Sequence, residues 1–144
     1  MFNIPYTKVS ENAKVPEKAN KGDAGLDLFA TESTTLYLGV TEMVGTGISI
    51  AIPYGYCGFV LPRSSMGKRG IIIPNSPGLI DSGYRGEVKV LLLNLSDQIY
   101  KVEEGDKIGQ LLVMRPEIIS MDEISNLPPS VDERGVSGFG SSGK

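Results

Sequence analysis

Short apolar runs, rich in β-branched residues, recur along this chain, and glycine or proline separates most of them. This pattern is typical of an all-β sandwich or barrel. A helical period of 3.6 residues is nowhere sustained for long, so only SSMGK (64–68) and MDEIS (121–125) are candidates for a helical turn or two. The apolar runs predict strands at Phe2–Val9, Leu26–Ala30, Thr34–Leu38, Val44–Ile52, Tyr56–Pro62, Gly70–Ile73, Glu87–Leu95, Gln98–Val102 and Lys107–Arg115.

The strand predicted at Glu87–Leu95 differs from the others because both of its alternating faces are apolar, apart from Lys89 and Asn94. Strands that are buried on both faces have such continuous apolar runs. We therefore expect this strand to be covered on both sides within the chain, or to pack against another chain. The second alternative is a first indication of oligomerisation.

The last fifteen residues, SVDERGVSGFGSSGK, contain four glycines, four serines and little that could be buried. Composition alone predicts a frayed tail. A lid is the alternative, since Phe139 lies between two glycines, and glycines let a backbone approach a ligand closely and bind an anion through its N–H groups.

Length and composition limit the chemistry. A chain of 144 residues is expected to form one domain. The absence of histidine excludes Ser-His-Asp triads, imidazole acid–base catalysis and nearly all zinc sites. The single cysteine, Cys57, lies among apolar residues and is expected to be a small buried hydrophobe. Carboxylates, hydroxyls, backbone amides, arginine and lysine are left to carry any activity.

Charge and hydropathy indicate where the protein acts. A net charge of −3 argues against direct nucleic-acid binding over the whole surface, but a local basic pocket for a small anion is compatible with it. No apolar run reaches the roughly 18 residues of a membrane span. The N-terminus has no basic flank followed by a hydrophobic stretch, so we expect a cytoplasmic protein, with a nuclear or viral setting left open.

Basic and hydroxyl side chains gather in PRSSMGKRG (62–70), directly after a predicted strand. Arg63 has the fork geometry that suits a phosphate, and Ser64 and Ser65 add neutral donors. The segment lacks the spacing of a P-loop, and a solvated basic turn is the alternative interpretation. Gln110 is a polar interruption of an apolar strand, where a structural amide is the simplest interpretation.

A second polar constellation occupies NSPGLIDSGYRGE (75–87). Asp81 follows Leu79 and Ile80, so we expect it to end a buried strand segment rather than to lie on an open surface. A carboxylate there can orient a water and accept its proton, or else cap the turn. Tyr84 is either a core residue or a stacking platform, and the Asn75 amide suits the edge of a base such as uracil as well as it suits a turn.

Asp27 interrupts the apolar strand AGLDL (24–28), where it is expected to face inward or toward a metal. Burial of an uncompensated carboxylate costs several kcal/mol. The sequence therefore predicts that Asp27 has a cationic partner or a metal nearby.

These segments and the tail, in this order, resemble the homotrimeric dUTPase family (deoxyuridine 5′-triphosphate nucleotidohydrolases) over nearly the whole chain. Five motifs carry the resemblance: AGLDL (24–28), PRSSMGKRG (62–70), NSPGLIDSGYRGE (75–87), GDKIGQLL (105–112) and RGVSGFGSSG (134–143). It implies a jelly-roll-like β-barrel, residues 1–130, with residues 131–144 as a flexible lid. It also implies a trimer with three active sites at subunit boundaries, which uses Mg²⁺ to hydrolyse dUTP to dUMP and pyrophosphate.

The resemblance assigns roles to individual residues. Asp81 matches the family carboxylate that activates the water attacking the α-phosphorus, and Tyr84 matches the aromatic under the deoxyribose. Asp27 matches the acid that acts on Mg²⁺ through water, while the metal itself is held mainly by the triphosphate. The substrate contacts it implies are Arg63, Ser64, Ser65 and Gln110 for the phosphates, Asn75 and Gly78 of the hairpin for uracil, and Arg134, Phe139, Gly140, Ser141 and Ser142 of the closing tail.

Two positions depart from the family pattern. Many members have a second Asp just before the tyrosine, where this chain has Gly83, and a glycine is common where this chain has Ser65. Three alternatives remain beside the dUTPase interpretation: a dCTP deaminase with the same fold, an interaction protein gated by bound dUTP, and a purely structural barrel. The hairpin resembles the uracil-reading form, which favours the dUTPase.

Overall fold

The computed structural model describes residues 3–131, and eleven elements lie within this part of the chain. All the named strand pairs are antiparallel. The elements are β1 (Tyr6–Lys8), β2 (Leu26–Phe29), β3 (Thr34–Leu36), β4 (Thr41–Ile50), β5 (Cys57–Leu61), α1 (Ser64–Gly67), β6 (Ile71–Ile72), β7 (Gly78–Ile80), β8 (Glu87–Asn94), β9 (Tyr100–Val102) and β10 (Lys107–Met114).

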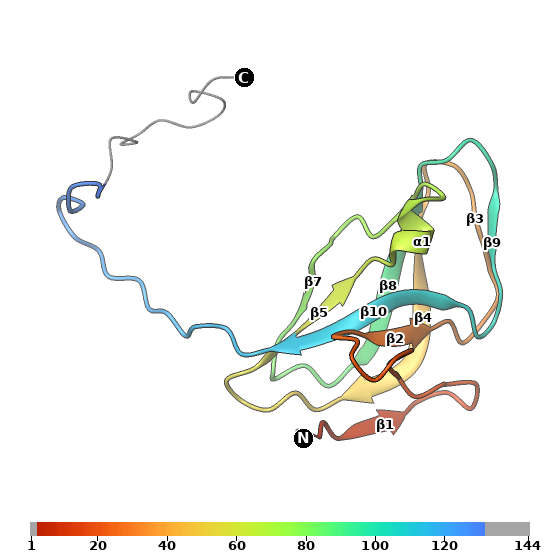
Figure 1. The fold of residues 1–144 in the computed structure, drawn as a ribbon, viewed down its shortest axis with the longest axis horizontal. Coiled ribbons are helices and arrows are strands. Elements are labelled where there is room, and N and C mark those ends of the chain that lie inside the picture. Colours follow the sequence, from red (N-terminus) through yellow and green to blue (C-terminus); the bar gives the residue numbers. More distant parts are fainter. Residues whose placement is uncertain (1–2, 132–144) are drawn as a thin grey trace.

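Two four-stranded sheets form the body, in the orders β1-β4-β8-β6 and β2-β10-β5-β7, and β3 and β9 pair as a separate ribbon. In Figure 1 the strands of the second sheet cross in front of β4 and β8, with the β3–β9 ribbon at the right. The core contains inward-facing side chains of both sheets, among them Leu28, Ile48, Val60, Val90 and Ile108. The all-β, jelly-roll-like architecture is the expected one.

Strand β8 has one fully buried face and one half-covered face. Val88, Val90, Leu92 and Asn94 are buried, whereas the residues at Leu91 and Leu93 are only partly covered. Asn94 is fully buried on the core face, where its side-chain amide donates to the carbonyls of Leu36 (2.9 Å) and Gln98 (2.8 Å). The half-covered face keeps open the prediction that another chain packs on this strand.

The predicted strands are confirmed in position, but several are shorter in the structure. The first predicted strand contracts to Tyr6–Lys8, and β4 begins at Thr41, three residues before its predicted start. The strand segment expected before Asp81 is confirmed as β7, but its bounds were not predicted, because three residues of a Gly-Pro-rich hairpin form too short an apolar run to delimit. The helical turn at SSMGK is confirmed as α1, and Cys57 is buried.

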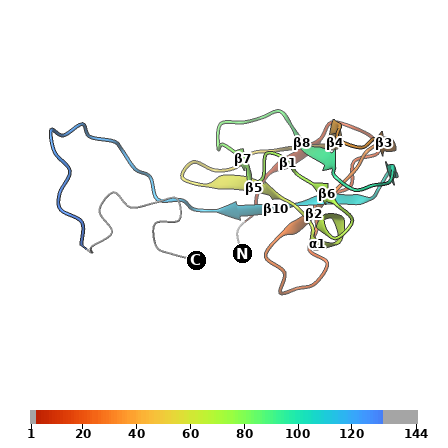
Figure 2. The same cartoon turned by 90° about the horizontal axis from the view of Figure 1, so that it is seen from above.

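The segment that follows β10 leaves the barrel. Residues 115–131 carry no helix or strand, and Figures 1 and 2 show them running away from the sheets. The prediction of a helical turn at MDEIS (121–125) is therefore wrong, because this stretch has no surface of its own chain to pack on. Within the described residues, no helix has the length and apolarity that crossing a bilayer would require.

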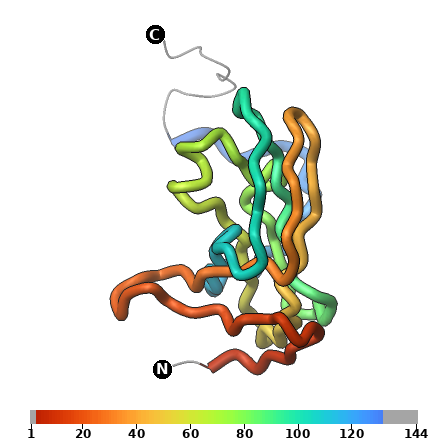
Figure 3. Tube along the Cα trace, turned by 90° about the vertical axis from the view of Figure 1, so that its right-hand side faces the viewer, coloured from red at the N-terminus to blue at the C-terminus, as the bar shows by residue number. Residues whose placement is uncertain are grey.

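The bend between β3 and β4 and the bend between β8 and β9 lie side by side at one end of the molecule (Figures 1 and 3). The Gly39 amide donates to the Asn94 carbonyl across them, at 2.8 Å. Helix α1 lies close to this end, and β1 lies at the opposite one (Figure 1).

Candidate active site

The site residues predicted from the sequence, as far as they belong to the described part of the chain (3–131), line two separate pockets. The first, called here the hairpin pocket, has a volume of about 260 Å³ and includes Asn75, Gly78, Asp81 and Tyr84. The second, called the Asp27 pocket, has a volume of about 380 Å³ and includes Asp27, Arg63, Ser64, Ser65 and Gln110. No predicted site residue lines both pockets, so a single chain holds the expected site residues in two separate groups.

The hairpin pocket is built by β7 and the turn that follows it. The Tyr84 amide donates to the Asp81 carbonyl (3.0 Å), which closes the turn, and the Tyr84 hydroxyl donates to the Glu87 carbonyl (2.9 Å), which fixes the ring. A Cβ on Gly78 would lie 3.3 Å from the Asn75 side-chain nitrogen, so glycine leaves the space beside this amide open. The turn therefore holds an aromatic ring, an amide and a carboxylate around one cavity.

Asp81 ends a strand, as predicted, but the prediction that it avoids an open surface is wrong for the isolated chain. Along this hairpin Gly78 and Ile80 face inward and Leu79 faces outward, so the strand alternation directs Asp81 outward as well. Within the described part of the chain, neither the Asp81 carboxylate nor the Asn75 amide makes a side-chain hydrogen bond or ion pair. Both groups are thus available to a ligand.

In the Asp27 pocket, a nearly buried carboxylate connects two cations. The Asp27 residue is 8% exposed, and its Oδ1 accepts from Arg63 Nε at 3.0 Å while its Oδ2 pairs with Lys107 Nζ at 2.7 Å. The prediction that Asp27 needs a partner is confirmed. Because Nε is committed to Asp27, the two terminal nitrogens of Arg63 remain at the end of the side chain, and one reaches Ser65 Oγ at 3.4 Å.

Gln110 joins the same pocket from β10. Its Nε2 donates to the Pro62 carbonyl at 2.9 Å, immediately before Arg63. Gln110 is also paired in register with Asp27 on β2 and with Leu61 on β5. Gln110 thus acts as a structural amide, as its place in an apolar strand predicted, and its side chain also lines the pocket.

The register of β5 explains why the two pockets are separate. Gly58, near the start of β5, pairs with Ile80, so Asp81 lies level with the first residue of the strand. Arg63 follows the other end of β5, after Leu61. Asp81 is therefore opposite Cys57, six residues from Arg63 along the strand direction, which corresponds to about 20 Å at 3.3 Å per residue.

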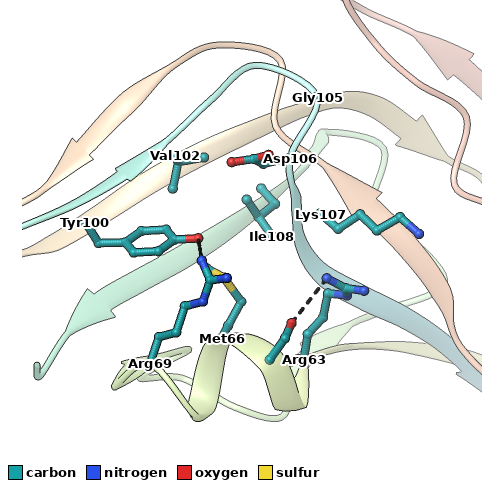
Figure 4. A pocket seen from close by; sticks show the side chains of 10 residues that line it. Arg63, Met66, Arg69, Tyr100, Val102, Gly105, Asp106, Lys107 and Ile108 are labelled. Atoms are coloured by element: carbon teal, nitrogen blue, oxygen red, sulfur yellow. Dashed lines mark hydrogen bonds between the residues drawn. The ribbon is translucent and has the colours of Figure 1, made fainter.

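Several residues around these pockets were not predicted. Lys107 pairs with Asp27 from a strand 80 residues away in the sequence, and Figure 4 shows its side chain beside that of Arg63. Met43, Glu87 and Lys89 contribute to the hairpin pocket. The signal for Lys107 was its place in GDKIGQLL, but only the pairing of β2 with β10 shows which carboxylate it meets.

Other predicted residues lie outside the described part of the chain. Arg134, Phe139, Gly140, Ser141 and Ser142 belong to residues 132–144. At Gly83, a Cβ would meet nothing within 4 Å, so the site of the missing second acid has room for a side chain. The turn therefore does not require a glycine at position 83 for lack of space, and sterics do not explain why this chain lacks the second acid.

The chain is similar to known proteins over nearly its whole length. The sequence profile of the dUTPase family matches residues 11–143. Proteins named deoxyuridine 5′-triphosphate nucleotidohydrolase from Corynebacterium glutamicum and Corynebacterium diphtheriae are 42% and 47% identical to the chain, respectively. The alignments cover 98% and 97% of this chain, and 95% and 92% of those proteins.

Solved structures extend the likeness to three dimensions. The dUTPase of Staphylococcus bacteriophage 80alpha with dUpNHpp superposes with a TM-score of 0.90 at 27% identity, covering all of both chains. A dUTPase mutant from phage phi11 of Staphylococcus aureus, described for its coordination of a structural Mg(II) ion, superposes with a TM-score of 0.80 at 25% identity. That alignment covers 87% of this chain and 98% of the phage protein. By sequence profile, by near full-length relatives and by fold, the chain belongs to the dUTPase family.

Proposed function

We propose that this protein hydrolyses dUTP to dUMP and pyrophosphate, with Asp81 activating the water that attacks the α-phosphorus. The observation that carries the proposal is the unpaired Asp81 carboxylate, which shares a pocket with the unpaired Asn75 amide and the fixed ring of Tyr84. Membership of the dUTPase family supports the same reaction. In a cell this activity limits uracil incorporation into DNA and supplies dUMP for thymidylate synthesis.

The hairpin pocket is proposed to bind the nucleoside. The Asn75 amide offers both a donor and an acceptor to the edge of uracil, and Gly78 leaves space for the base beside it. Tyr84 forms a wall that its bond to the Glu87 carbonyl keeps in place, and we assign to this wall the exclusion of a ribose 2′-hydroxyl. A wrong base leaves buried polar groups unpaired, which is why such a pocket discriminates strongly.

The Asp27 pocket is proposed to bind the phosphates. Arg63 has donors left after its bond to Asp27, and Ser64, Ser65 and Gln110 add neutral polar groups. Phosphoryl transfer needs charge neutralisation and an in-line water more than a covalent nucleophile, so this set suffices without histidine. For the segment outside the described residues we retain the assignment of Arg134 to the phosphates, Phe139 to uracil, and Gly140, Ser141 and Ser142 to closure over the nucleotide.

Mg²⁺ fits this donor set only as an ion carried by the substrate. Within the described residues, no group of three acidic or cysteine side chains is arranged to hold a metal, and both Asp27 oxygens already accept from cations. Mg²⁺ usually keeps several waters and binds phosphates rather than an all-protein cage. We assign to Asp27 an indirect role, in which its carboxylate contacts the waters bound to Mg²⁺. When bound, the ion would neutralise part of the charge of the phosphates.

A homotrimer with shared sites is the assembly we propose. Asp81 lies level with one end of β5 and Arg63 follows the other end, so one chain cannot present both to the adjacent phosphates of one nucleotide. If a second chain places its Arg63 against the hairpin pocket of the first, both residues can reach the same nucleotide. Residues 115–131 support the assembly because Ile119, Met121 and Leu127 are 78%, 89% and 86% exposed, and apolar groups so exposed are typical of a segment that packs on another chain.

Product analysis tests the proposed function. Purified protein with Mg²⁺ is incubated separately with dUTP, dTTP, dCTP and UTP, and dUMP, pyrophosphate and ammonia are measured. We expect dUMP and pyrophosphate from dUTP alone. Ammonia from dCTP would replace the proposal by a deaminase, and tight dUTP binding without turnover would replace it by a nucleotide-gated interaction protein.

A further inference from the structure

A third pocket lies between α1 and the turn that leads into β10, next to the Asp27 pocket. It has a volume of about 340 Å³, and we call it the Arg69 pocket. Figure 4 shows the side chains around it, with Arg69 and Tyr100 on one side and Arg63 and Lys107 on the other. Arg63 and Ser65 line both this pocket and the Asp27 pocket, so the two cavities are neighbours.

Arg69 is held in position although it lies at the surface. Its Nη1 donates to the Tyr100 hydroxyl at 3.0 Å, and its guanidinium carbon lies 5.6 Å from the centre of the Tyr100 ring. No carboxylate pairs with Arg69 among residues 3–131. Both contacts restrict a side chain that would otherwise sample many rotamers. Four of its five N–H groups remain for a ligand, because only one is bonded to Tyr100.

The charges around the pocket favour an anion. Three cations line it, namely Arg63, Arg69 and Lys107, and Asp106 is the carboxylate that opposes them. Asp106 is also engaged in its own turn, where Oδ2 accepts from the Glu103 amide at 2.9 Å. Arg63 and Lys107 share the single charge of Asp27, so their combined positive charge is only half neutralised.

We propose that the Arg69 pocket is a second oxyanion site, which binds the pyrophosphate released from the Asp27 pocket. This inference rests on the proposed function for the identity of its ligand. Arg63 borders both cavities, so the leaving group can keep one contact while it exchanges its others for Arg69 and the Tyr100 hydroxyl. A planar guanidinium with free edges binds two phosphate oxygens at once, which suits pyrophosphate better than a singly charged anion.

Calorimetric titration of the full chain with pyrophosphate, in the presence of Mg²⁺ and without dUTP, tests the site directly. Arg69→Gln removes the guanidinium, and Lys68→Gln is the matched control, because it removes the same charge from the neighbouring residue, which does not line the pocket. We expect Arg69→Gln to weaken pyrophosphate binding about tenfold, the value of one charge-assisted hydrogen bond, and Lys68→Gln to leave it within a factor of two. Tyr100→Phe, which keeps the ring and loses the hydroxyl, is expected to fall between them.

Steady-state kinetics separate this site from the substrate site. If the proposal holds, Arg69→Gln raises the inhibition constant for pyrophosphate by more than it raises KM for dUTP. Equal losses in Arg69→Gln and Lys68→Gln would overturn it in favour of a general effect of surface charge. Equal changes in KM and in the inhibition constant would also overturn it, because the pocket would then belong to the substrate site. The calorimetry needs no turnover, so a protein that does not hydrolyse dUTP still reports on pyrophosphate.

Discussion

At the scale of single residues, Asp27 lies in strand β2 and Asp81 directly follows strand β7, and the structure gives the two carboxylates opposite environments. Asp81 is exposed and unpaired beside the Asn75 amide, whereas Asp27 is nearly buried and holds two cations. An unpaired carboxylate in a cavity is available to a water, while a paired one orients its partners. The two acids are therefore expected to respond differently to the same amide substitution.

The substitution Asp81→Asn is expected to abolish turnover and to leave dUTP binding nearly intact. The water loses its base, whereas the residues assigned to the phosphates line a different pocket, at the other end of β5. Single-turnover kinetics combined with dUTP titration measure the two effects separately. Turnover at the rate of the unmodified protein would remove Asp81 from the mechanism.

The substitution Asp27→Asn is expected to lower the free energy of unfolding by about 1–3 kcal/mol, because Arg63 and Lys107 lose their shared, nearly buried carboxylate. KM for dUTP should rise as well, because the uncharged amide orients Arg63 less firmly than the carboxylate does. Asp23→Asn is the matched control, since Asp23 lines the same pocket but bonds only to Asn20 nearby. Comparable losses in both variants would argue against an orienting role for Asp27.

At the scale of elements, Asn94 connects three parts of the barrel. From the end of β8 its amide donates to the carbonyls of Leu36 in β3 and Gln98 before β9, and its Oδ1 accepts from the amide and hydroxyl of Ser96. A buried amide with all these bonds made specifies a single arrangement of the bend. This arrangement holds β9, which carries Tyr100 next to Arg69.

The substitution Asn94→Ala is expected to lower the free energy of unfolding by about 2–3 kcal/mol, because it leaves buried carbonyls without their donor. Ser96→Ala, which removes a more exposed hydroxyl from the same network, should cost about 1 kcal/mol or less. Urea unfolding at matched protein concentration measures both. A smaller loss in Asn94→Ala than in Ser96→Ala would show that the buried amide does not hold this bend.

At the scale of the whole molecule, residues 115–131 and the tail make separable contributions. Deletion of residues 115–144 removes the exposed apolar side chains and is expected to lower the mass measured by sedimentation from three times 15.4 kDa toward that of one chain. Deletion of residues 132–144 alone should keep the trimer and reduce turnover by orders of magnitude. A monomer in the full-length protein would contradict the shared site.

The sequence by itself was sufficient for the all-β class, for most strand positions and for many, though not all, of the polar residues around the two pockets. Strand alternation and turn residues act locally, so a run such as Glu87–Leu95 identifies a strand without knowledge of its neighbours. The absence of histidine excluded whole classes of mechanism before any contact was known. The family motifs then assigned the reaction, because they occur together and in order.

Only the tertiary structure decided which of these residues meet. Lys107 reaches Asp27 because β10 pairs with β2, and Asp81 is kept from Arg63 because they extend from opposite ends of β5. The position of Arg69 against Tyr100 likewise depends on a strand that lies 31 residues further along the chain. Local patterns specify elements and the faces of strands, whereas contacts between distant residues depend on strand order and register, which the folded sheets alone determine.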